Sequence, residues 1–324
     1  MHAVEGISNL NLKIMLTSML VFGVIAGILG AVLYYSGVRG MSGIYVWMGI
    51  SLLFILIQWY FGPNLIKWIT KARELAPNES PKLHHMVESL AHKARIPKPK
   101  LYVVNNPAPN AFAFGRTQSS AGIAVHTGLL DTLDEDELEG VIAHEIGHIK
   151  HRDVIIMTLA SALPVILYYL VIIFGSGDNR ERGIGSTIMV FVGAFIAQFI
   201  GQLLVLWLSR SREYYADAFS AYATGKPSAL MSGLAKITYK MEIAKPQPSS
   251  ASNAMRAFYI ADPSGESRGI IREIASAIAS GNESHLVEAI EKEKKMGRRE
   301  WLMTHPLTGK RLEALLKIKK QMAA

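Results

Sequence analysis

Two histidines four positions apart, His144 and His148, enclose a glutamate in the stretch AHEIGHIKHRD at residues 143–153. Residues four apart lie on one face of an α-helix, about 6 Å apart along its axis, so both imidazoles can bind one metal ion. The Glu145 side chain points about 100° round the helix from His144, where it can take a proton from a water that the metal activates. The spacing predicts a single Zn2+ site with Glu145 as general base.

A catalytic zinc needs a third protein ligand and one open position. His151 is near, but it lies on the same helix and its spacing is not that of an extended three-histidine motif. Residues 157–174 contain no acidic residue, so we expect the third ligand beyond them. Glu213 and Asp217, four apart in SRSREYYADAFSA, fit two roles. Glu213 is predicted to bind zinc, and Asp217 to accept the second ring N–H of a ligand histidine.

The alternative for this acidic pair is structural. Glu213 and Asp217 can instead form ion pairs with Arg210 and Arg212 at a membrane surface. The two histidines and the glutamate upstream favour the metal site, because a two-histidine site needs a carboxylate from elsewhere in the chain.

The helix that carries the histidines has a recognisable start. Asp134 can cap its N-terminus, and Glu137 three residues on completes a capping box. Basic residues at 150–152 suit its C-terminal end. Gly147 inside this helix costs up to about 1 kcal/mol relative to alanine, which predicts that another part of the chain approaches the backbone there.

Other elements follow from periodicity and turn residues. We predict strands at 101–104, 111–114 and 122–125, and helices at 70–95, 209–223, 270–279, 283–294 and 307–322. The strand at 110–114 can be a sheet edge near the zinc that binds an extended peptide, or an ordinary hairpin strand. His305 in THPLTGKR can stabilise an oxyanion or cap the last helix.

Half of the residues are hydrophobic and only 19% are charged, which is typical of a membrane-anchored protein with a water-exposed domain. Four stretches of roughly 18–22 residues without charge predict transmembrane helices. They are residues 14–35, 44–61, 157–174 and 187–208. The second pair can alternatively form a helical hairpin buried in a large soluble core, because Pro164 and two glutamines interrupt it.

Charge near the predicted spans indicates their orientation. Lysine and arginine gather after the second span, before the third and after the fourth, which places these segments in the cytoplasm by the positive-inside tendency. The net charge of +8 then suits flanks beside anionic lipid. The absence of cysteine excludes disulfides and thiolate metal sites, and no basic motif with interleaved aromatic residues indicates nucleic-acid binding.

Four motifs, PNAFAFG, HEIGH, SREYYAD and THP, occur in an order that resembles the HtpX-type membrane zinc metalloproteases. These belong to the gluzincin superfamily, which also holds the CAAX prenyl proteases. The resemblance implies zinc ligands His144, His148 and Glu213, the base Glu145, and Asp217 in support. It also implies substrate contact by Asn110 and Ala111, and a role in clearing misfolded or damaged membrane proteins.

The predicted fold is α+β and mostly helical, a gluzincin-like protease domain with a small β-sheet and about four transmembrane helices. We expect an N-terminal hairpin at 1–62, protease segments at 63–156 and 209–324, and an apolar hairpin at 157–208 between the HEIGH motif and the third ligand. The expected partners are unfolded membrane proteins and the lipid bilayer of the plasma membrane.

Two other functions compete with a quality-control protease. A prenyl-protein protease has a similar catalytic core but needs a large chamber of many spans, which four spans cannot easily build. A zinc-stabilised membrane scaffold without catalysis would need only the ligands, so the presence of Glu145 argues against it.

Overall fold

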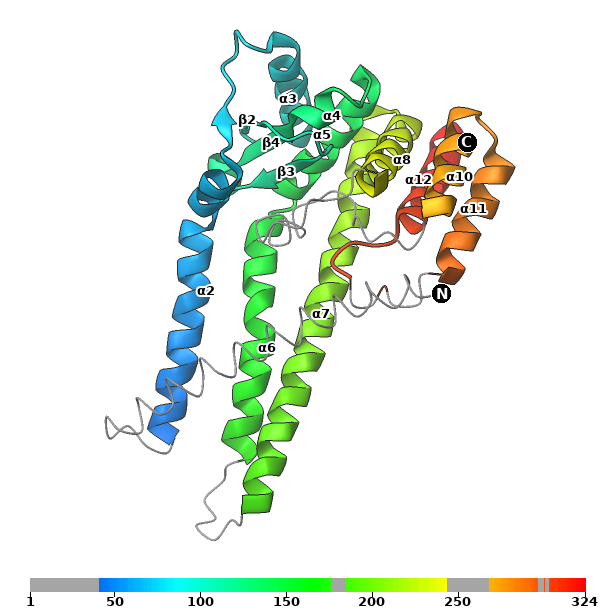
Figure 1. Ribbon diagram of the computed structural model, residues 1–324. Coiled ribbons are helices and arrows are strands. Elements are labelled where there is room, and N and C mark those ends of the chain that lie inside the picture. Colours follow the sequence, from blue (N-terminus) through cyan, green and yellow to red (C-terminus); the bar gives the residue numbers. More distant parts are fainter. Residues whose placement is uncertain (1–40, 176–183, 244–267, 297–299, 301–302) are drawn as a thin grey trace. The chain divides into compact units, whose positions relative to one another are not determined.

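The computed structural model describes residues 41–175, 184–243, 268–296, 300 and 303–324 (Figure 1). The chain divides into two compact units. Of the described residues, those up to Phe61 and from Ile156 to Leu208 form the apolar unit, and those at 62–155 and from Ser209 onward form the sheet-containing unit. The predicted first span at 14–35 and the Pro/Ser-rich stretch at 244–253 lie outside the described residues.

Three described helices are long and apolar enough to cross a membrane. They are α2 (Met41–Thr70), α6 (Asp153–Gly175) and α7 (Ile184–Thr224), and they contain the predicted spans at 44–61, 157–174 and 187–208. Large apolar side chains on α6 and α7 face outward, with Phe174 81% and Met189 72% exposed. This exposure favours a lipid-facing pair over a hairpin buried in a soluble core.

The helices of the apolar unit pack through small and aromatic residues. Tyr168, Tyr169 and Ile172 of α6 form a buried cluster with Ala194 of α7, against which Trp47 of α2 packs. At Gly201 of α7 a Cβ atom would lie 2.8 Å from Pro164 Cα, so the glycine allows the two backbones to approach.

The sheet has four strands in the order β1-β2-β4-β3, with β3 at an edge. They are β1 (Arg73–Glu74), β2 (Lys100–Val104), β3 (Ala111–Phe114) and β4 (Gly122–His126). β2 and β4 are parallel, whereas β3 and β4 are antiparallel with Ala111 opposite Val125. The three predicted strands and the edge position of β3 are thereby confirmed.

Helices of the sheet-containing unit surround one core. They are α3 (Pro81–Ala94), α4 (Thr127–Leu130), α5 (Glu135–Lys150), α8 (Pro227–Ile243), α10 (Arg268–Ala279), α11 (Glu283–Met296) and α12 (Thr308–Ala323), with a 3-10 turn at Gln118–Ser120. The predicted helix over 70–95 is wrong in its first half. Residues 73–74 form β1, Pro77 cannot continue a helix, and Pro81 is the first residue of α3.

Helix α5 lies in the centre of this core. Asp134 caps it, and the capping box with Glu137 forms as predicted. Its residues from Gly140 to Gly147 are buried, with Ile142 and Ile146 packed in the main hydrophobic cluster. A Cβ atom at Gly147 would lie 3.0 Å from Ala216 Cα of α7, which confirms the predicted close approach. The hydroxyl of Ser220 donates to the Gly140 carbonyl at 2.6 Å and adds a polar bond to the same contact.

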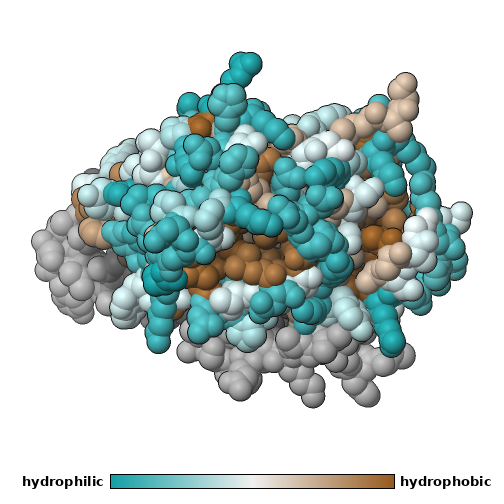
Figure 2. Space-filling model, turned by 90° about the horizontal axis from the view of Figure 1, so that it is seen from above, coloured by the Kyte–Doolittle hydropathy of each residue, from teal (hydrophilic) through white to brown (hydrophobic). Residues whose placement is uncertain are grey.

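The face of the molecule seen in Figure 2 is largely hydrophilic, and a band of hydrophobic residues shows in the recess at its centre. Such a surface is typical of a part of the chain that water covers.

Candidate active site

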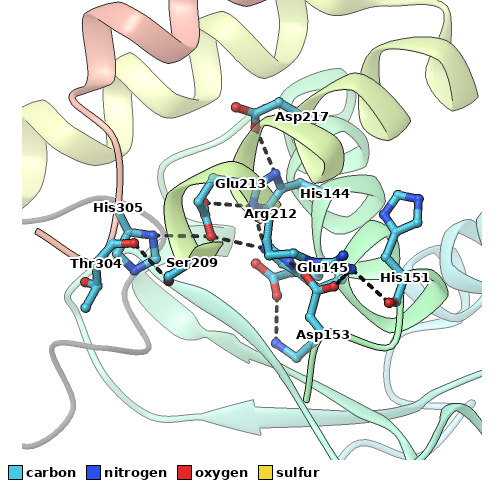
Figure 3. A network of polar contacts seen from close by, with 12 residues as sticks. His144, Glu145, His151, Asp153, Ser209, Arg212, Glu213, Asp217, Thr304 and His305 are labelled. Atoms are coloured by element: carbon cyan, nitrogen blue, oxygen red, sulfur yellow. Dashed lines mark hydrogen bonds and ion pairs between the residues drawn. The ribbon is translucent and has the colours of Figure 1, made fainter. Parts of the chain in front are cut away.

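Three predicted ligands converge where α5 meets α7 (Figure 3). The Nε2 atoms of His144 and His148 are 3.1 Å apart. Glu213 Oε2 lies 3.5 Å from the first and Oε1 lies 3.4 Å from the second. Ligand atoms around a tetrahedral zinc stand about 3.3–3.5 Å apart, because each Zn–N or Zn–O bond is about 2.0–2.2 Å. The close packing at Gly147 brings α5 and α7 near enough for the three ligand atoms to lie 3.1–3.5 Å apart, close to this spacing.

Each histidine uses its other ring nitrogen for a carboxylate. His144 Nδ1 lies 2.9 Å from Asp217 Oδ1, and His148 Nδ1 lies 2.6 Å from Asp153 Oδ2. A carboxylate accepts only, so both Nδ1 atoms carry a proton, and the two Nε2 atoms near Glu213 are the ones that a metal would bind. Asp217 therefore lies where the sequence predicts it, and Asp153 is a second such carboxylate.

A buried arginine on α12 joins this cluster. Arg311 Nε and Nη2 donate to the two oxygens of Asp217 at 2.8 and 2.6 Å, and Nη1 lies 3.3 Å from Glu213 Oε2. This two-point pairing fixes Asp217 in the plane of the guanidinium. The alternative prediction, in which Glu213 and Asp217 pair with Arg210 and Arg212, is therefore wrong. Both acids contact Arg311 and the histidines instead.

The neighbouring arginines of α7 have other partners. Arg212 forms an ion pair with Asp153, and Arg210 Nη1 donates to the Met303 carbonyl at 2.9 Å. Neither arginine therefore forms the predicted ion pair with Glu213 or Asp217. The two acids of α7 contact the histidines, whereas its two arginines contact Asp153 and the Met303 carbonyl.

Glu145 is buried beside the two histidines and is held by the sheet edge. The Ala113 backbone N–H of β3 donates to its Oε2 at 2.6 Å. Burial raises the pKa of Glu145, against the opposing attraction of His148 and His144. A carboxylate with a raised pKa is a stronger base, which suits a group that must take a proton near neutral pH.

The two histidines differ in protonation. Burial disfavours the charged ring of His144, but hydrogen bonds to Asp217 and Glu213 outweigh it and raise the pKa of His144 to about 9. Burial lowers the pKa of His148. Without a metal, the His144 ring is therefore positively charged at neutral pH, with a proton on each nitrogen. A metal ion that binds Nε2 must displace the proton there.

His305 lies on the opposite side of Glu213. Its Nδ1 is 3.3 Å from Glu213 Oε1. The preceding loop is tied to α7, because Ser209 Oγ donates to the Thr304 carbonyl at 3.0 Å (Figure 3). The N-cap of α12 is Leu307, so His305 does not cap that helix and instead lies beside Glu213, two residues before the N-cap.

The edge strand brings Asn110 and Ala111 to the same side of the sheet-containing unit as Glu145. The backbone N–H of His126 donates to the Asn110 carbonyl at 2.9 Å, so residue 110 pairs with β4 through its backbone. Hydrogen bonding alternates along an antiparallel pair, so the backbone groups of Ala111 and Ala113 point away from β4, to an edge that no described strand covers and at which Ala111 is buried. Ala113 uses its N–H for Glu145, and Ala111 is the next edge residue.

The residues present suit a divalent metal such as zinc. Two neutral imidazole nitrogens and one carboxylate are a known donor set for zinc. Glu213 Oε2 is buried and has no hydrogen bond within the described residues, although Arg311 and His144 lie within ion-pair distance. A cation between the three ligand atoms would satisfy this oxygen.

Asp153 and Arg311 were not predicted from the sequence. Arg311 had a visible signal, since it occupies a position flanked by Leu307 and Leu315 on the apolar face of the last helix. Asp153 had none, because five positions along a continuous helix would turn it about 140° away from His148. Arg152 has a positive φ of 58°, which ends α5 and returns Asp153 toward the histidine.

Comparisons with known proteins identify a family and several relatives. The profile described as Peptidase family M48 matches residues 77–319. A protein named Protease HtpX homolog from Methanothermobacter thermautotrophicus is 40% identical over 237 residues, 72% of this chain and 87% of its own. Another from Pyrococcus abyssi is 43% identical over 223 residues, 66% and 77% of the two chains. The crystal structure of Ste24p from S. mikatae has a TM-score of 0.48 at 17% identity, covering 94% of this chain and 67% of that one.

The family match extends over three quarters of the chain and includes every residue of the metal cluster, from the edge strand to Arg311. Three apolar helices accompany it in the described residues. The chain is therefore a membrane metalloprotease that belongs to peptidase family M48.

Proposed function

We propose that this chain is a zinc-dependent endopeptidase of the plasma membrane that hydrolyses misfolded or damaged membrane proteins. The observation that carries the proposal is the convergence of His144, His148 and Glu213 at 3.1–3.5 Å beside a buried glutamate. His144, His148 and Glu213 would hold one Zn2+ per chain, with Asp217 orienting His144. The names of the relatives support proteolysis, and the three apolar helices support substrates within or near a membrane.

Zinc bound here would polarise the scissile carbonyl and lower the pKa of a water to about 7. The Glu145 carboxylate takes a proton from the attacking water as its oxygen bonds to the carbonyl carbon. Glu145 then gives this proton to the amide nitrogen as the C–N bond breaks, so the leaving amine departs neutral. The Ala113 N–H fixes the carboxylate for both transfers. The His305 ring donates a hydrogen bond to the oxyanion of the tetrahedral intermediate.

The free edge of β3 is proposed to bind the substrate as an added strand, with Asn110 and Ala111 at the contact. Backbone hydrogen bonds give affinity with little demand on side chains, which suits a protease that meets many unfolded sequences. Because Ala113 holds Glu145, a peptide on this edge also lies beside the base.

Ala111→Pro tests the edge strand. Proline removes the Ala111 N–H, which points to the free edge, and edge strands tolerate this loss. We expect kcat/KM for an unfolded substrate to fall about 10-fold or more, the equivalent of one or two backbone hydrogen bonds. The bound zinc should stay the same. An unchanged kcat/KM would exclude substrate binding at Ala111.

Removal and return of the metal tests the enzyme itself. Purified full-length chain stripped by a chelator should be inert, and added Zn2+ should restore cleavage of an unfolded membrane protein and of the chain itself. Zinc binding without any cleavage would instead identify a non-catalytic scaffold. Cleavage restricted to prenylated C-terminal peptides would identify a prenyl-protein protease.

The active site is proposed to face the cytoplasm. The basic residues that flank the predicted spans support this orientation, since Lys150 and Arg152 precede α6 and Arg210 and Arg212 follow residue 208. The chain has no cysteine, so a single cysteine placed at Ser176 can be labelled selectively. An impermeant thiol reagent should label it in intact cells. Labelling only after the cells are opened would reverse the orientation.

A further inference from the structure

Asp153, the first residue of α6, contacts the ligand His148 and an arginine at the same time. Its Oδ2 accepts the Nδ1–H of His148 at 2.6 Å, and its Oδ1 pairs with Nη2 of Arg212. Arg212 Nη2 also donates to the His151 carbonyl at 2.8 Å, at the turn between α5 and α6. A guanidinium can serve both acceptors from one plane, which an ammonium group does less well.

The other predicted ligand, His144, also contacts an aspartate that is paired with an arginine. His144, Asp217 and Arg311 form a chain of contacts like that of His148, Asp153 and Arg212. The first chain is buried, with side chains 1–3% exposed, whereas the second is 11–19% exposed. The carboxylate of the second chain lies closer to water, which can compete for its oxygens, and Arg212 occupies one of them.

The Asp153–Arg212 pair also has a distinct place in the sequence. The two residues are 59 positions apart, and the apolar stretches at 157–174 and 187–208 lie between them. Their ion pair joins the chain just before this insertion to the chain just after it. The Asp217–Arg311 pair does not join the two sides of the insertion, because both residues follow it in the sequence.

We propose that Asp153 is a positioning residue that sets the orientation and metal affinity of His148, and that Arg212 acts on the metal through Asp153. This inference rests on the proposed function in that it takes His148 as a zinc ligand. The carboxylate holds the proton on Nδ1, directs the Nε2 lone pair to the metal and makes the ring a better donor. The guanidinium keeps the carboxylate at the end of α5.

The test is the zinc affinity of the full-length chain in detergent, measured by competition with a chromogenic chelator. Asp153→Ala is expected to bind zinc about 10–100-fold more weakly, as for other partners of ligand histidines. Asp153→Asn keeps one acceptor oxygen but loses the charge, so its loss should be near the lower end of that range. Asp136→Asn, at an exposed acid of α5 paired with Lys226, is the matched control and should bind like the wild type.

A double-mutant cycle separates a relay from two independent effects. Arg212→Ala alone should weaken zinc binding, but it should add nothing in the Asp153→Ala background. The unfolding temperature of the metal-free proteins shows whether a variant is folded. If Asp153→Ala is not, the isosteric Asp153→Asn carries the test.

Each outcome decides a different statement. Wild-type affinity in Asp153→Ala, or in Asp153→Asn where the alanine variant fails to fold, overturns the role of Asp153. Additive losses in the cycle overturn the action of Arg212 through it. If the wild type binds no zinc, or if His148→Ala binds it as well as the wild type, the proposed function fails instead.

Discussion

Glu145→Gln is expected to keep its zinc and lose proteolysis. The amide has the shape of the carboxylate, and its oxygen can still accept the Ala113 N–H, so the local structure should remain. It cannot take a proton from water. General-base catalysis contributes about 10²–10⁴-fold in rate, which corresponds to about 2.7–5.4 kcal/mol of activation free energy.

The measurement is kcat on an unfolded membrane substrate, together with metal content. Glu139→Gln on the same helix is the control, since its side chain pairs with Lys226 and lies outside the metal cluster. We expect the control to cleave at the wild-type rate. Full activity in Glu145→Gln would remove Glu145 as the base, whereas loss of zinc from this variant would show that the change disturbed the ligands.

Glu213→Ala is expected to abolish stable zinc binding. It removes one of three ligands, so the affinity should fall by more than the roughly 10–100-fold that a residue behind a ligand contributes. The variant also leaves Arg311 with Asp217 as its remaining carboxylate partner among these acids. The metal-free fold should survive, because the two-point contact between these residues persists.

Thermal unfolding with and without zinc distinguishes loss of the site from loss of the fold. The wild type should gain about 2.7 kcal/mol of unfolding free energy at a free zinc concentration 100 times the Kd. Glu213→Ala should gain almost nothing, and Glu135→Ala, an exposed acid at the start of α5, should gain as much as the wild type. A wild-type gain in Glu213→Ala would remove Glu213 from the ligand set.

Local signals in the sequence predicted most of the catalytic helix and its ligands. The capping box at Asp134 located the start of α5, and the four-residue spacing of the histidines determined one metal-binding face. The need for a third ligand directed attention past the apolar stretch to Glu213. The start of α5 and the shared face of the two histidines could be predicted because both depend on the geometry of a single helix.

Contacts that join distant segments were less visible. Arg311 reaches Asp217 across 94 positions, and no local rule relates the two. Asp153 depends on a backbone turn at a residue with positive φ that is neither glycine nor asparagine. Helix α8 was also missed, although it packs on α5 at Gly140, where a Cβ atom would lie 3.1 Å from the backbone of Leu230.

The place of the ligands along the chain has a consequence for biosynthesis. Ribosomes add about 5–20 residues per second, so His144 and His148 exist for several seconds before Glu213 is made. During that interval the apolar stretches at 157–174 and 187–208 are being synthesised. A nascent chain therefore has two histidines but no third ligand until the apolar stretch at 187–208 has been synthesised. Synthesis order alone therefore delays completion of the three-ligand site until both apolar stretches have been made.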